Sequence, residues 1–188
     1  MKRINTIAIA TLAVSFIIAG CNNTKSITPS EAGEIEIVEL CSGDGYLPDS
    51  KHFRASATGT SVQRETAKKI ARANAENKLG RSISVTLSAL TDNSVTSMSF
   101  NNQEEATSVF KEHARSTVKQ ELRGAITICE KLTQKPDGTY SSYIAIELSG
   151  EGIAQAYNER LAKDERIMAE YNYENFKETF EAEMNKLN

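Results

Sequence analysis

The sequence has no tryptophan, only 6% aromatic residues and only two histidines among its 188 residues. A ligand platform built from aromatic rings is therefore not expected. The histidines, His52 and His113, are isolated, and two lone imidazoles make no metal site without carboxylates that the sequence does not position. The motifs of serine hydrolases, zinc proteases, phosphate-binding loops and dinucleotide-binding folds are also missing. We therefore expect no catalytic residue, no metal and no cofactor, and a protein that is not an enzyme.

Neither sign of charge is in large excess, because the formal net charge is -3. Such mild acidity predicts neither a nucleic-acid surface nor a basic patch for anionic lipid. Glu65 and Glu76 alternate with lysine and arginine, which is typical of a solvated helix face. Asp44 and Asp49 lie among glycine, proline and serine, and the pattern favours turns over a calcium loop.

No apolar run reaches the roughly 20 residues that a membrane-spanning helix needs. A shorter run at 7–18 follows Lys2 and Arg3 and is typical of a secretory signal peptide. It ends in Ile-Ala-Gly-Cys, which resembles the lipobox of bacterial lipoproteins, whose cysteine is diacylated before cleavage. We therefore expect residues 1–20 to be removed and Cys21 to carry a palmitate-like lipid anchor.

Such an anchor predicts where the chain resides, because two or three acyl chains hold a protein to a membrane almost permanently. Residues 21–34 are polar and are expected to form a tether. No acidic cluster follows Cys21 directly. We therefore expect a cell-envelope protein on the outer membrane, facing the periplasm. Its expected partners are the membrane, through the lipid, and an envelope protein, but no nucleic acid.

Three segments with alternating apolar residues predict a small antiparallel sheet. Two of them, 125–133 and 139–148, flank a Pro-Asp-Gly sequence that ends at Gly138, and such a turn predicts a hairpin. The third segment is 53–58. An arm at 35–40 is a candidate edge strand.

Helices are expected to cover this sheet. Thr60 and Gln63 match a capping box for the first helix, whose apolar spacing continues to about Leu90. Residues 82–87 also alternate with period two, so a strand there stays an alternative. The later helices are expected to begin at Asn102, at Ser149 and at Asp164.

Together these elements predict one α+β domain over residues 35–188, with a small antiparallel sheet packed against helices. Its last helix is long and acidic, because seven acidic residues fall between Asp164 and Glu183. Large apolar side chains are rarely left exposed without a role. We therefore expect this helix to pack, on its own domain or on a partner, through Tyr171, Phe176 and Phe180.

The segment Phe53–Ser61 and the alanine-rich helix after it, with Ala67, Ala71 and Ala75, resemble the LPP-twenty family of bacterial lipoproteins. The hairpin strands are similar to members of that family as well. The resemblance implies an α+β fold and an envelope location, and it carries over no catalytic residue. Alanines on successive turns let a helix lie close to a sheet, so we expect them in the core rather than along a ligand groove.

Cys41 and Cys129 are expected to form a disulfide. Once Cys21 is lipidated, two cysteines remain in an exported domain, and an oxidising compartment favours their pairing. The alternative is two separate buried thiols that act as small apolar side chains.

These observations predict a lipid-anchored envelope protein with a structural or adaptor role in protein interactions. The alternative is a binding module for a small envelope ligand or a peptidoglycan fragment, held in a hollow between sheet and helices. A pocket that placed His52 or His113 beside a carboxylate would instead favour an enzyme.

Overall fold

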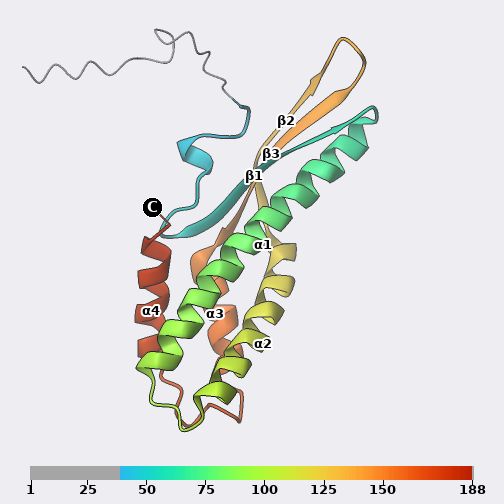
Figure 1. Cartoon of the computed structure of the whole chain (residues 1–188). Helices are drawn as coiled ribbons and strands as arrows, with labels where there is room; N and C mark the ends of the chain where they lie inside the picture. Colours follow the sequence, from blue (N-terminus) through green and yellow to red (C-terminus); the bar gives the residue numbers. More distant parts are fainter. Residues whose placement is uncertain (1–38, 188) are drawn as a thin grey trace, which may run out of the picture. The chain divides into compact units, whose positions relative to one another are not determined.

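A computed structural model describes residues 39–187 of the chain (Figure 1). The predictions for the signal peptide, Cys21, the tether and residues 35–38 of the arm lie outside this range. Glu39 and Leu40, the described end of the arm, belong to no strand. The rest forms an antiparallel sheet packed with helices, so the predicted α+β class is confirmed.

The sheet contains β1 (His52–Ser61), β2 (Ile126–Gln134) and β3 (Tyr140–Ser149) in the order β1-β3-β2. Both pairings are antiparallel, and the predicted hairpin is confirmed. Its turn depends on Gly138, which has a φ of 84° and whose amide donates to the carbonyl oxygen of Lys135. In this strand order the central strand is β3, the last of the three in the chain.

The first helix, α1 (Arg64–Ser97), is longer than predicted, and the alternative strand at 82–87 is wrong. It continues through Thr91 and Ser94, which are buried although their polarity predicted a break. The Thr91 hydroxyl donates to the carbonyl oxygen of Leu87 at 2.7 Å, which satisfies this polar group inside the helix.

The predicted capping box at Thr60 is also wrong. Thr60 and Ser61 continue β1 and pair with Ser141 and Tyr140, and α1 has Gln63 as its N-cap with no side-chain cap. Pairing with β3 thus places these two residues in a strand. The local sequence, with its hydroxyl and amide side chains, does not reveal that pairing.

Three further helices surround the C-terminal half of α1 (Figure 1). They are α2 (Gln103–Glu121), α3 (Gly150–Leu161) and α4 (Tyr173–Asn185), and short 3-10 turns lie at Asp44–Tyr46 and Leu122–Gly124. The predicted caps Asn102 and Ser149 each accept a backbone amide three residues later.

The last helix begins at Tyr173, and the prediction that it begins at Asp164 is wrong. The Asp164 carboxylate accepts the backbone amide of Arg166 at 3.0 Å, which stabilises a turn in place of a helix. Residues 165–170 form turns, and the Asn172 side chain then caps α4.

The alanine ladder lies in the core, as predicted: Ala67, Ala71 and Ala75 are fully buried against the sheet. Gly59 of β1 allows this close approach. A methyl group at Gly59 would lie 2.3 Å from the backbone oxygen of Ala67 and 2.3 Å from the backbone nitrogen of Ala71.

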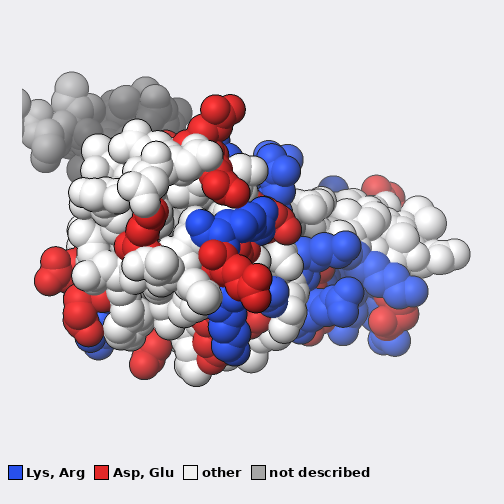
Figure 2. Space-filling model, turned by 90° about the horizontal axis from the view of Figure 1, so that it is seen from below, with Lys and Arg blue, Asp and Glu red and all other residues white. Residues whose placement is uncertain are grey.

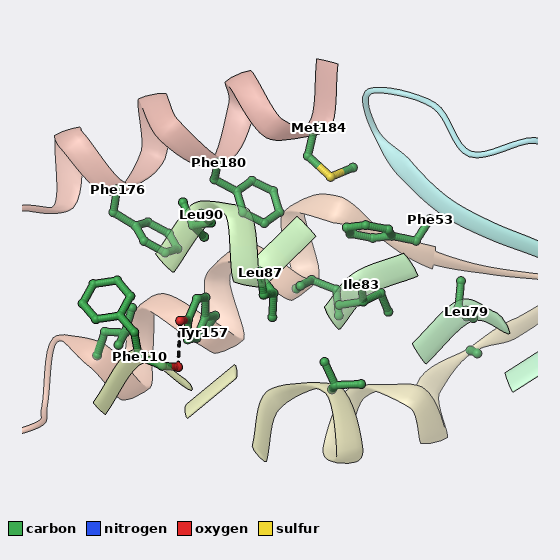
Figure 3. Close-up of a cluster of buried hydrophobic side chains, with 14 of the residues drawn as sticks. Phe53, Leu79, Ile83, Leu87, Leu90, Phe110, Tyr157, Phe176, Phe180 and Met184 are labelled. Atoms are coloured by element: carbon green, nitrogen blue, oxygen red, sulfur yellow. Dashed lines mark hydrogen bonds between the residues drawn. The ribbon is translucent and has the colours of Figure 1, made fainter. Parts of the chain in front are cut away.

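Aromatic side chains fill the core between the helices (Figure 3). Phe176 and Phe180 of α4 are buried there, so this helix packs on its own domain. Tyr157 donates its hydroxyl proton to the carbonyl oxygen of Phe110 at 2.9 Å, and burial raises the pKa of this phenol well above its usual range. The core thus fixes α3 against both α2 and α4.

Candidate functional sites: an open strand edge, a groove and a basic end

Cys41 and Cys129 lie at disulfide distance, with 2.10 Å between the sulfur atoms and 5.6 Å between the Cα atoms. The predicted pair is therefore brought together. Cys129 follows an irregularity in the β2–β3 register and lies opposite Ala145. The pair therefore links the chain before β1 to β2, the strand that lies on the other side of β3 from β1.

His52 lies beside a carboxylate at the start of β1. Its Nδ1 is 3.3 Å from Asp49, which also accepts the amides of Lys51 and His52 and binds Arg54 at 2.7 Å. Burial opposes ionisation of Asp49, but the two amides and the charge of Arg54 outweigh it and lower its pKa to about 2. Arg54 also binds Glu147 of β3 at 2.6 Å, so this network fastens the preceding turn to the sheet.

His113 of α2 also lies beside a carboxylate, with its Nε2 2.7 Å from Asp164. The Arg166 guanidinium donates to the same carboxylate at 2.6 Å and, despite burial, holds the pKa of Asp164 well below its usual range, with help from His113. The pair thus fastens the turn after α3 to α2. Each histidine has the carboxylate neighbour that would favour an enzyme, but each carboxylate is shared with an arginine in an ion-pair network.

The outer edge of β1 is covered by side chains of α1. Asn74 donates to the carbonyl oxygen of Thr58 at 3.0 Å, and Lys78 donates to that of Ser56 at 2.9 Å. These contacts occupy backbone acceptors that an added strand would need.

The outer edge of β2 is open in the described part of the chain, because no strand pairs with it there. Hydrogen bonding alternates along antiparallel strands. The carbonyl of Ser56 points away from β3, so the backbone groups of Ala145, which pairs with Ser56, point the other way, toward Cys129 of β2. The direction alternates along β2, and the backbone groups of Glu130 and Leu132 therefore point outward.

All nine residues of β2 are exposed or half-buried. Arg72 and Lys68 of α1 still reach this strand, at the Thr127 hydroxyl and at the Glu130 carboxylate. Ile126 is 59% exposed and Leu132 is 37% exposed. The exposure arises because α1 packs on β1 and β3.

A groove of about 640 Å³ lies between α3, α4 and the residues before β1. Its lining combines Phe176, Phe180 and Met184 with the charged Lys51 and Lys177. Core side chains pack between the sheet and the helices, and this groove lies beside α4 rather than in the hollow that the sequence predicted.

One end of the sheet is basic. The turn from β1 to α1 and the turn from β2 to β3 leave this end together, because Ser61, Tyr140 and Gln134 are aligned across the strands. We call it the turn end: residues 62–72 and 130–139. It carries six basic and three acidic residues, and lysine and arginine gather on the narrow part of the molecule at the right of Figure 2. The net charge had predicted no basic patch, and that prediction is wrong for this end.

The mixed charges on the first part of α1 include ion pairs, as predicted. Arg64 pairs with Glu65, and Arg72 pairs with Glu76 at 2.6 Å, on a half-exposed or exposed face. Within residues 39–187, no group of three or more histidine, cysteine, aspartate or glutamate side chains is arranged to hold a metal ion. In the same range no helix is both long enough and apolar enough to cross a bilayer.

The chain matches no family model, no curated protein and no solved structure. Its resemblance to the LPP-twenty lipoproteins therefore stays a prediction from the residues around Gly59 and the alanine ladder.

Proposed function

We propose that this protein is a lipid-anchored component of the bacterial cell envelope, on the outer membrane facing the periplasm, with a structural role and no catalysis. The observation that carries the proposal is the order of features at the N-terminus: Lys2 and Arg3, a short apolar run, then small residues before Cys21. The LPP-twenty resemblance supports the same location.

The role that we propose is protein interaction through the outer edge of β2. An open edge offers backbone donors and acceptors to an extended segment of a partner, and exposed apolar side chains add contact area. The contrast with β1 supports this choice, because Asn74 and Lys78 occupy the other edge. The partner strand would meet the outward backbone groups of Glu130 and Leu132.

Lipidation is tested by metabolic labelling of the full chain with a fatty-acid probe. The wild-type chain is expected to carry label and the Cys21→Ala variant none, because no other cysteine follows an apolar run and a small-residue pair. A Cys41→Ala, Cys129→Ala variant is the matched control and is expected to keep its label. Label on the Cys21→Ala chain would disprove this anchor.

The interaction edge is tested by Leu132→Pro. Proline removes the outward amide of residue 132 without touching the bonds from β2 to β3, which edge strands tolerate. An unsatisfied partner carbonyl costs about 1–3 kcal/mol, so association is expected to fall by about 5-fold to 150-fold. The measurement is photo-crosslinking in the native envelope from a reactive residue placed at Thr133, which is exposed.

Leu132→Ala is the control for this test, because it removes the same side chain and keeps the amide. It is expected to retain most of the cross-link, and thermal unfolding of both variants checks that the fold is intact. Equal cross-linking of folded Leu132→Pro and Leu132→Ala chains would contradict strand addition at this edge.

The groove beside α4 favours the second candidate function, a binding module for a small envelope ligand. Its lining combines apolar and charged side chains, as the lining of ligand sites does. This function predicts a small molecule that co-purifies with the protein, whereas the adaptor role predicts a protein cross-linked to β2.

A further inference from the structure

The turn end combines positive charge with exposed apolar side chains. Its basic residues are Arg64, Lys68, Lys69, Arg72, Lys131 and Lys135. Of these, Lys68 pairs with Glu130, Arg72 with Glu76, and Arg64 with its neighbour Glu65. Lys69, Lys131 and Lys135 form no ion pair with another side chain of residues 39–187, so these three charges are available to a partner.

Charge is distributed unevenly over the domain. Between Val62 and Arg72 the chain has four basic residues and one acidic residue, whereas residues 164–183 have seven acidic and two basic residues. These acidic residues belong to α4 and the turn before it, which pack at the other half of α1. A negatively charged surface is therefore attracted to the turn end and repelled by the opposite end.

Val62 is the apolar residue at the tip of this end. Its side chain is 75% exposed in the turn between β1 and α1, and Ile70 lies two helical turns further on with 38% exposed. A turn that needed only solubility would place polar residues there. Apolar side chains bordered by lysine and arginine are instead the combination that binds the interface of an anionic bilayer.

We propose that the turn end docks on a bilayer surface rich in anionic phospholipid, with Val62 in the interfacial layer and Lys69 and Lys135 beside the headgroups. A nucleic acid or an acidic protein would match the charge but not the exposed Val62. The choice of a membrane rests on the proposed lipid anchor, which keeps the domain beside one. Docking would hold the domain against the surface and direct its acidic α4 end away from it.

Tryptophan fluorescence tests this proposal, because the chain contains no tryptophan of its own. The full-length Val62→Trp protein is added to vesicles of phosphatidylcholine, with or without phosphatidylglycerol. Its emission is expected to move to shorter wavelength, and to be quenched by brominated acyl chains, on the anionic vesicles only. The shift is expected to disappear in 1 M salt, where screening acts within about 3 Å.

Val85→Trp is the matched control. Val85 is also exposed, at 71%, and lies about 30 Å further along α1. Its emission is expected to stay unchanged on the same vesicles, and both proteins have the same N-terminal segment, so a difference between them does not come from that segment. The readout therefore reports docking of the turn end, independently of whether Cys21 is lipidated, which the labelling experiment decides.

Charge reversal provides a second test of the proposal. Lys69→Glu, Lys131→Glu, Lys135→Glu in the Val62→Trp protein is expected to abolish the shift. Reversal of three exposed lysines elsewhere, Lys111→Glu, Lys163→Glu, Lys177→Glu, changes the net charge equally and is expected to preserve it. The proposal is overturned by an equal shift on neutral vesicles, by an equal loss in both triple variants, or by a shift with polyglutamate or single-stranded DNA but not with vesicles.

Discussion

The Gly59→Ala variant is expected to lose more than about 3 kcal/mol of unfolding free energy, and to fold poorly in consequence. The added methyl group would lie 2.3 Å from backbone atoms of both Ala67 and Ala71. A side chain could rotate away, but the backbone of α1 is fixed by its own hydrogen bonds. The helix must therefore move off the sheet and give up the packing of the alanine ladder.

Urea unfolding followed by circular dichroism measures this loss. Gly124→Ala is the control, because nothing lies within 4 Å of a methyl group at that position, and it is expected to change stability by less than about 0.5 kcal/mol. A Gly59→Ala protein as stable as the wild type would show that α1 and β1 do not approach as closely as described.

Loss of the bond between Cys41 and Cys129 is expected to cost about 4–5 kcal/mol. The two residues are separated by 88 positions, and in the chain-entropy model a closed loop of that length restricts the unfolded chain strongly. The double variant Cys41→Ala, Cys129→Ala removes the bond without leaving a free thiol. Its unfolding midpoint in urea is expected to fall well below that of the oxidised wild type and to be insensitive to reductant.

Mass spectrometry of the denatured protein after thiol alkylation checks the bond itself. Neither Cys41 nor Cys129 is expected to be alkylated until reductant is added. Alkylation of both without reductant would establish two separate thiols, and the double variant would then lose only the contribution of two small buried side chains.

The backbone at Cys41 modifies the size of this effect. Cys41 has a φ of 58°, in the left-handed region that costs a residue with a Cβ atom roughly 1–2 kcal/mol. Part of the stabilisation by the disulfide therefore offsets strain at one of its own ends. This left-handed backbone at Cys41 lies shortly before η1 (Asp44–Tyr46).

The sequence by itself determined the features whose partners lie within a few residues. The caps at Asn102 and Ser149 bind amides three residues away, and the hairpin turn is completed between Lys135 and Thr139. The pairing of Cys41 with Cys129 was also predicted from the sequence, because two cysteines remain once Cys21 is taken as the expected lipid site. The α+β class followed from periodicity, since buried strands and helices impose different spacings on their apolar residues.

Only the tertiary structure decided where elements end and which surfaces stay open. Thr60 and Ser61 match a helix cap but lie in β1, because β3 supplies partners more than seventy residues away. Within residues 39–187 the side chains of β2 stay exposed or half-buried because α1 packs on β1 and β3, and nothing within residues 126–134 encodes the position of that helix. The basic turn end likewise joins residues 62–72 to 130–139, so its charge is invisible in a net value for the whole chain.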